Sequence, residues 1–155
     1  MTHTNNETPV VEQPATKPDD NRALDPLEFL STFPNAPTKE NIAIYKNSSP
    51  GHRIKLFTSS DMKRVYIMRG ITAFELQKLQ EGILSTVKES NYENELQIAV
   101  ACKCCIWTST TSTTKLNEMD IKGSGAGLAV NLYHIVSELS DYVAPSQLDR
   151  FTADL

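Results

Sequence analysis

Four side chains that bind metal ions occur in the second half of the chain: Cys102, Cys104, Cys105 and His134. Four thiolate or imidazole ligands are the number that a structural zinc ion requires. On one helix, however, Cys102 and Cys105 would share a face while Cys104 would point elsewhere, and no second Cys-x-x-Cys pair follows. We therefore expect reduced cysteines that pack as small hydrophobic residues, and no metal ion.

A glycine-rich stretch, Gly-Ser-Gly-Ala-Gly at 123–127, precedes a run of apolar residues. Glycines before a helix let backbone N–H groups approach a phosphate. This stretch fits neither phosphate-binding template, because Leu128 stands where the dinucleotide fingerprint has glycine and no Gly-Lys-Ser/Thr follows. We expect a flexible helix entry with a close-packing role, and no nucleotide or other cofactor.

Nothing in the histidine or carboxylate spacing indicates catalysis. The three histidines are His3 near the N-terminus, His52 in a turn and His134. His134 and Glu138 are one helical turn apart, a spacing that an exposed i,i+4 pair explains without chemistry. Without a nucleophile, base and orienting acid, the sequence predicts no catalytic residues and a protein that is not an enzyme.

The 155 residues allow one compact domain with an appendage. Residues 1–37 contain two basic and six acidic side chains, so the formal net charge of −4 belongs to this segment and the remainder is neutral. A neutral domain with a pI near 5.4 argues against binding to nucleic acid. No apolar run of 18 residues and no signal peptide are present, so we expect a soluble protein without a membrane partner.

The N-terminal 37 residues are predicted to form an acidic, proline-rich arm. Residues 1–23 contain too few large apolar side chains to offset the entropy of ordering them. A short helix near 25–32 follows, with an aspartate cap and a proline in its first turn. Its apolar residues make it a candidate docking element, represented by Leu27, Phe29 and Leu30.

A helix and a β-hairpin are predicted next. Residues 38–46 begin with a capping threonine after a proline and favour a helix, although their composition also permits a strand. Two runs rich in β-branched and aromatic residues, 53–58 and 63–69, predict the hairpin. Its basic residues are expected to form a local positive patch; they are Arg53, Lys55, Lys63, Arg64 and Arg69.

Three helices are predicted in the second half. A capping box of Thr72 with Glu75 opens a helix at about 72–89, in which Gly82 indicates a close approach. A second box at Ser90 and Glu93 predicts a helix that continues to Trp107. After a polar loop at 108–124, apolar spacing indicates a helix that ends near residue 141.

These elements predict an α+β fold that is predominantly helical, with the β-hairpin at about 53–69 packed on three to four helices and an extended N-terminal arm. The expected divisions are the arm at 1–37, a helical domain with the hairpin at 38–143, and a peripheral C-terminal tail at 144–155.

The order of motifs resembles that of small tail-assembly proteins of large tailed bacteriophages. The resemblance begins with Pro-Thr-Lys-Glu-Asn-Ile…Tyr-Lys at 37–46 and Val-Tyr-Ile-Met-Arg-Gly-Ile-Thr-Ala-Phe-Glu-Leu at 65–76. It continues with Ala-Cys-Lys-Cys-Cys-Ile-Trp at 101–107 and Gly-Ala-Gly-Leu…Ile-Val-Ser-Glu-Leu-Ser-Asp-Tyr at 125–142. The chain departs from the family pattern at Tyr45, where tryptophan is usual, at Ala73, and in lacking a proline after Trp107.

The resemblance implies a tail-assembly chaperone that binds a helical tail or baseplate protein in the host cytoplasm during assembly. Arg64 and Arg69 would steer acidic partners. The expected apolar contact surface comprises Ile71, Phe74, Leu128, Leu132 and Tyr133. The alternatives are that Leu128 and Leu132 belong to the core and that Arg69 anchors the hairpin to the next helix.

Two other functions remain open at this point. The protein could be a permanent component of the virion tail or baseplate that laces onto neighbouring subunits, or onto copies of itself as a homo-oligomer, through its arm. It could also be an early phage or host-interaction protein without a role in the tail.

Overall fold

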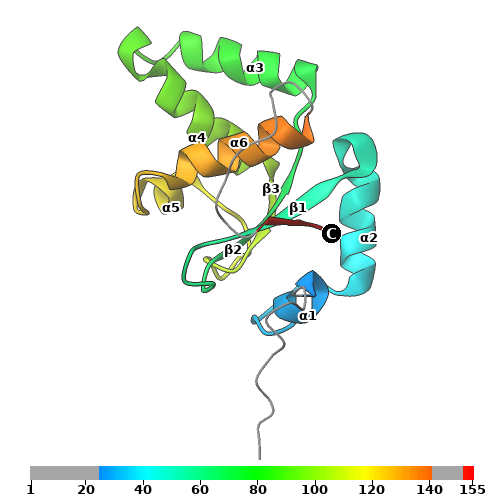
Figure 1. The fold of residues 1–155 in the computed structure, drawn as a ribbon. Coiled ribbons are helices and arrows are strands. Elements are labelled where there is room, and N and C mark those ends of the chain that lie inside the picture. The colour runs from blue at the N-terminus through cyan, green and yellow to red at the C-terminus, as the bar shows by residue number, and fades with distance from the viewer. Residues whose placement is uncertain (1–24, 141–151) are drawn as a thin grey trace, which may run out of the picture.

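The computed structural model describes residues 25–140 and 152–155 (Figure 1). Predictions for the arm before residue 25 and for residues 141–151 of the tail lie outside these ranges. The described part of the chain has an antiparallel sheet in the order β3-β2-β1-β4. Strands β1 (Ile54–Thr58) and β2 (Val65–Arg69) form the predicted hairpin, in which Ile54 faces Arg69 and Thr58 faces Val65.

Helices cover both faces of this sheet. Side chains alternate across a strand, so Leu56 and Ile67 enter one core while Phe57, Tyr66 and Met68 enter another. We call the cluster that contains Phe57, Tyr66 and Met68 the first core. The cluster that contains Leu56 and Ile67 is the second core. Helices α1 (Pro26–Leu30) and α2 (Lys39–Ser48) lie over the second core, and α4 (Tyr92–Cys104) and α6 (Leu128–Leu139) lie over the first (Figure 1). The α+β prediction is confirmed.

Helix α1 belongs to the folded unit and not to an arm. The Asp25 side chain accepts a hydrogen bond from the Leu27 N–H at 3.0 Å, as the cap predicts. Leu30, however, is buried in the second core, and the Trp107 indole N–H donates to the Asn35 carbonyl at 3.1 Å. Placing residues 25–37 in the arm is therefore wrong, because this segment covers a face of the sheet that would otherwise be open to water.

Capping boxes locate the start of two predicted helices. Thr38 and Asn41 exchange hydrogen bonds at the start of α2, and Thr72 and Glu75 do so at the start of α3 (Ala73–Leu84). Helix α3 ends five residues before the predicted boundary. An added Cβ at Gly82 would meet no atom within 4 Å, so the predicted close approach is wrong.

The region after α3 differs most from the prediction. The capping box expected at Ser90 does not form, since α4 begins after Asn91 without a side-chain cap. Helix α4 stops at Cys104, and the chain continues as strand β3 (Cys105–Thr108), which pairs with β2. Helix α5 (Glu118–Lys122) interrupts the predicted loop. Strand β4 (Thr152–Asp154) pairs with β1, so the end of the tail is part of the sheet and not peripheral.

Candidate protein-binding surface

Helix α3 is the least buried of the α-helices that the structure describes. None of its twelve residues is buried; Leu76, Leu79 and Ile83 are half-buried against the first core. Phe74 is 68% exposed at one end of the helix and Leu84 is 64% exposed at the other. We call the outward side of α3, which carries Phe74 and Leu84, the α3 surface. In Figure 1, α3 lies at the edge of the molecule, beyond α4 and away from the sheet.

Phe74 is held at the start of α3 by the capping box that precedes it. The Thr72 hydroxyl accepts from the Glu75 N–H at 3.2 Å, and the Glu75 carboxylate accepts from the Thr72 N–H at 3.1 Å. The Lys78 ammonium lies 5.4 Å from the centre of the Phe74 ring. The exposed ring and the cation beside it offer an apolar contact with a positive rim.

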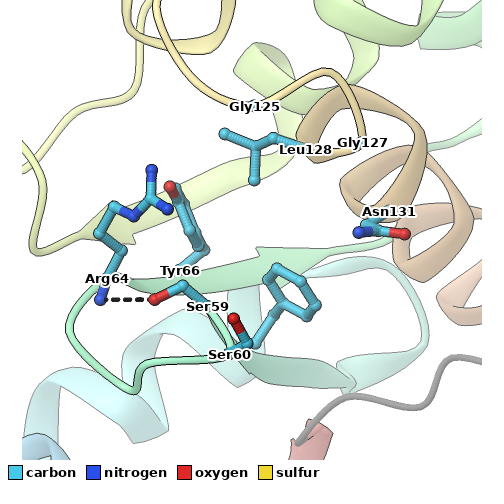
Figure 2. Close-up of a pocket in the computed structure, with 9 residues that line it drawn as sticks. Ser59, Ser60, Arg64, Tyr66, Gly125, Gly127, Leu128 and Asn131 are labelled. Atoms are coloured by element: carbon cyan, nitrogen blue, oxygen red, sulfur yellow. Dashed lines mark hydrogen bonds between the residues drawn. The ribbon is translucent and has the colours of Figure 1, made fainter.

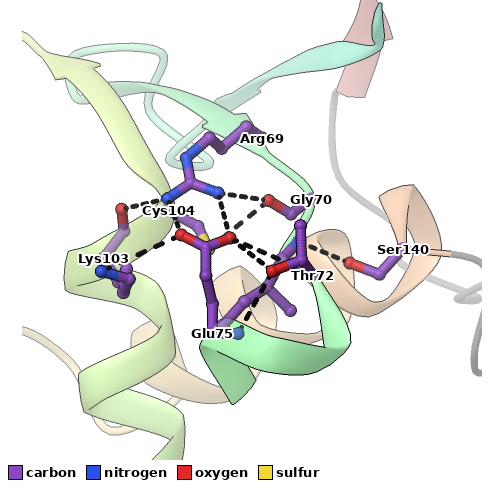
Figure 3. A network of polar contacts seen from close by, with 8 residues as sticks. Arg69, Gly70, Thr72, Glu75, Lys103, Cys104 and Ser140 are labelled. Atoms are coloured by element: carbon purple, nitrogen blue, oxygen red, sulfur yellow. Dashed lines mark hydrogen bonds and ion pairs between the residues drawn. The ribbon is translucent and has the colours of Figure 1, made fainter. Parts of the chain in front are cut away.

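Arg69 is a structural residue at the base of this surface (Figure 3). Its Nη1 and Nη2 donate to the two Glu75 carboxylate oxygens at 3.1 and 2.9 Å, in a bidentate pair. Nη1 also donates to the Gly70 carbonyl at 2.8 Å, and Nη2 donates to the Lys103 carbonyl at 3.4 Å. The guanidinium therefore joins the end of β2 to the start of α3 and to the end of α4. Arg69 thus anchors the hairpin to the next helix, as the alternative states, and its charge is paired with Glu75; its steering of acidic partners stays a prediction.

The Arg69–Glu75 pair also sets the protonation of the carboxylate. Hydrogen bonds from Arg69 lower the pKa of Glu75 to about 2, with a further contribution from Thr72. A carboxylate that accepts a bidentate guanidinium stays charged well below its usual range. The Arg69–Glu75 ion pair is thus intact over the whole physiological pH range.

Ile71 belongs to the core and not to a contact surface. Its side chain is 4% exposed in the first core, and its N–H donates to the Ser140 hydroxyl oxygen at 2.8 Å. The Ser140 hydroxyl in turn donates to the Val136 carbonyl at 2.6 Å. The structure therefore uses Ile71 to attach the β2–α3 connection to the end of α6, which corrects the prediction for this residue.

The other predicted contact residues are distributed over distant parts of the fold. Leu27 is exposed on α1, Phe29 packs edge-on against Phe33 with ring centres 5.3 Å apart, and Leu30 is buried. Tyr133 is half-buried on α6 against the first core, on the opposite side of the sheet from α1. These residues do not form one groove with Phe74. The prediction of contact through Leu30 is wrong because its side chain fills the second core.

The expected positive patch on the hairpin is also divided. Lys55 pairs with Glu138 of α6 at 3.4 Å, and Arg69 pairs with Glu75. Lys63 and Arg64 are exposed at the turn, at the other end of the strands. The basic residues thus lie at two ends of the hairpin and two of them are already neutralised by carboxylates.

The three cysteines are free thiols in or beside the first core. Burial raises the pKa of Cys102 to about 11 and the pKa of Cys104 and Cys105 to about 12. Such thiols remain protonated near neutral pH and are poor nucleophiles. Within residues 25–140 and 152–155, no three His, Cys, Asp or Glu side chains are placed to hold a metal ion.

Sequence reasoning missed several exposed apolar residues. Leu84 on α3, Ile44 on α2 and Met119 on α5 all show large apolar area to solvent. Leu84 lies off the side of α3 that carries Leu76, Leu79 and Ile83. An apolar residue that lies off the apolar face of a predicted helix is the sequence signal that indicates such an exposed side chain.

Comparisons of the chain with protein-family models, with curated proteins and with solved structures found no match. Among the described residues, no helix has the length and apolar character needed to cross a membrane.

Proposed function

We propose that the protein is a non-enzymatic assembly factor of a bacteriophage tail, a chaperone that binds an amphipathic helix of a tail protein through the α3 surface. The observation that carries the proposal is that α3 has no buried residue and shows Phe74 and Leu84 at its two ends. The resemblance of the chain over residues 38–143 to phage tail-assembly proteins supplies the setting.

The α3 surface suits reversible binding to a helix. A partner helix presents apolar residues three and four positions apart, which can contact the exposed side chains of Phe74 and Leu84 at the two ends of α3. Burying one large apolar side chain contributes about 1.5–3 kcal/mol before the costs of association. Two exposed anchors therefore favour a weak complex, as a chaperone that must release its client requires.

The proposal is tested by placing a photo-crosslinking amino acid at position 74 during phage infection and identifying the product by mass spectrometry. The expected product joins the protein to a tail protein with long helices. The matched control is position 44, because Ile44 is 61% exposed but lies on α2, over the other face of the sheet. Equal crosslinking from both positions, or a product with a second copy of this chain alone, would contradict the proposal.

A Phe74→Ser substitution should weaken the identified complex about tenfold or more, while Ile44→Ser should leave it unchanged. Binding is measured by titration with the purified partner. Both side chains are largely exposed, so neither change should unfold the protein. A loss of affinity in both variants would place the contact elsewhere.

Quantitative mass spectrometry of purified virions separates the chaperone from a permanent virion component. We expect the protein to be absent from finished particles. Its presence in stoichiometric amounts would favour the structural alternative, and a gene far from the tail-tube and tape-measure genes would count against any role in the tail.

A further inference from the structure

A hollow of about 170 Å³ lies between the turn of the β1–β2 hairpin and the start of α6 (Figure 2). Arg64, Tyr66 and Ser60 line it from the hairpin, and Gly125, Gly127 and Asn131 line it from the glycine-rich stretch and α6. The hollow is on the same side of the sheet as the first core and is separate from the α3 surface. Its lining combines polar groups that come from segments far apart in the sequence.

Tyr66 is the most unusual group in this hollow. Its side chain is 1% exposed, yet its hydroxyl has no hydrogen-bond partner within residues 25–140 and 152–155. A buried hydroxyl normally has a partner, because leaving it unpaired loses its hydration without compensation. Figure 2 shows the end of the Tyr66 side chain beside the Arg64 guanidinium, below the loop that carries Gly125.

Arg64 has a fixed backbone and an uncommitted side chain. Its N–H donates to the Ser59 hydroxyl at 3.0 Å, and its carbonyl accepts from the Ser59 N–H at 2.9 Å. Its guanidinium is exposed to solvent and makes no hydrogen bond or ion pair with any other described residue, although its charge helps to lower the pKa of Asp61 in the same turn. This charge is therefore positioned by the turn but remains available to a ligand.

The nearby acidic groups are already engaged. Asp61 accepts hydrogen bonds from the Ser59 hydroxyl and from the Lys63 N–H. Asp120 accepts from the Asn117 N–H at 3.1 Å as part of the cap of α5. The start of α6 has no comparable carboxylate, because its cap is Gly127, which has no side chain; of its first-turn N–H groups, that of Leu128 donates to the Gly125 carbonyl at 3.1 Å. A negatively charged group would therefore meet donors there.

We propose that Arg64 and Tyr66, together with the uncapped start of α6, bind a small oxyanion, a carboxylate or a phosphoryl group, in this hollow. The guanidinium would contribute the charge, and the Tyr66 hydroxyl would donate the buried hydrogen bond that no other residue of 25–140 and 152–155 accepts. Burial raises the pKa of Tyr66 above its ordinary value, so the hydroxyl stays a donor at neutral pH. The site does not depend on the proposed role of the α3 surface.

The site is tested by NMR titration of the full-length protein with sodium phosphate and, separately, with sodium acetate, against sodium chloride at equal ionic strength. We expect saturable shifts of the Gly125 and Gly127 amides and of the Arg64 Nε–H with at least one oxyanion. Tighter binding of phosphate would identify a phosphoryl ligand, and tighter binding of acetate would identify the carboxylate of a protein partner.

Three variants test the assigned contacts. Arg64→Met should weaken oxyanion binding at least tenfold, whereas Lys63→Met, which removes an equal charge from the neighbouring exposed residue, should change it less than twofold. Tyr66→Phe should weaken binding about fivefold, as expected for one hydrogen bond. The same variant should keep or raise the midpoint of thermal unfolding, because the hydroxyl that it removes has no hydrogen-bond partner among the residues that the structure describes.

Two results would overturn the assignment. One is the absence of saturable shifts with both oxyanions, or equal losses from Arg64→Met and Lys63→Met, which would indicate only a diffuse surface charge. The other is a lower thermal midpoint in Tyr66→Phe, which would show that the hydroxyl has a structural role. Phe74→Ser serves as an independent control and should bind oxyanions as the natural protein does.

Discussion

The two ends of the β1–β2 hairpin each carry an arginine, and their surroundings differ. At the open end, Arg69 makes two hydrogen bonds to Glu75 and two to backbone carbonyls, and its side chain is mostly covered. At the turn, Arg64 is exposed and its guanidinium has no partner among the described residues. The open end is a junction of β2, α3, α4 and α6, whereas the turn faces a hollow.

This contrast shows that the role of a basic residue depends on what its fold places opposite it. Both arginines belong to the same predicted hairpin, and both were expected to steer acidic partners. Glu75 is fixed near Arg69 because it also closes the capping box of α3. The turn contains a carboxylate as well, that of Asp61. This carboxylate already accepts hydrogen bonds from the Ser59 hydroxyl and the Lys63 N–H.

The largest expected difference between the two ends is in stability. Arg69→Met should lower the free energy of unfolding by about 2 kcal/mol, because it breaks a bidentate charged pair and leaves Glu75 without its main partner. Arg64→Met should change it by less than about 0.5 kcal/mol. Urea unfolding of both variants measures the difference, and equal losses would remove the distinction between the two arginines.

Glycines provide a second comparison of the same two regions. An alanine Cβ at Gly70 would lie 3.0 Å from the Leu139 carbonyl oxygen and 3.1 Å from the Ser140 hydroxyl oxygen. Gly70→Ala should therefore cost about 1–2 kcal/mol, since backbone atoms must shift to accommodate it. At Gly125 the added Cβ would meet nothing within 4 Å, and Gly125→Ala should be close to neutral. Thermal unfolding of the pair checks this, and a tolerated Gly70→Ala would show that the junction is loosely packed.

The smallest effect concerns the pH dependence of stability at the open end. The folded-state pKa of Glu75 is about 2, below its ordinary value of 4.5, so its contribution to stability is complete above about pH 4.5 and is lost as the pH falls toward 2. Because the pair is partly exposed, we expect about 1 kcal/mol to be lost in this window. Urea unfolding at pH 6 and pH 3 should show a smaller pH effect in Glu75→Gln than in the natural protein. An unchanged pH effect would assign the acid sensitivity to other carboxylates.

Local signals in the sequence located several elements. The capping boxes of α2 and α3, the two β-branched runs of the hairpin and the apolar spacing of α6 each depend on residues within a few positions of one another. For these elements the prediction and the structure agree in type. Phe74 was also predicted as a contact residue and is exposed, since it lies on the first turn of a helix whose start the capping box fixes.

The elements that the prediction missed depend on distant pairings. Cys105, Ile106 and Trp107 continue the apolar run of α4, and with Thr108 they become a strand because they hydrogen-bond with the edge of β2. Strand β4 forms in the same way against β1. Leu30 was assigned to a docking helix, but the second core needs a residue to cover Leu56 and Ile67. None of these partners is near in sequence, so periodicity could not reveal them.

The sequence alone determined the hairpin, the helices with strong caps, the neutral charge of the region after residue 37 and the presence of exposed basic residues. Only the tertiary structure decided which face of each element is covered, which arginine is neutralised and which buried hydroxyl has no partner among the described residues. The physical reason is that capping and strand propensity act over a few residues, whereas burial and charge pairing depend on contacts between β2, α3, α4 and α6 that form only when the chain folds.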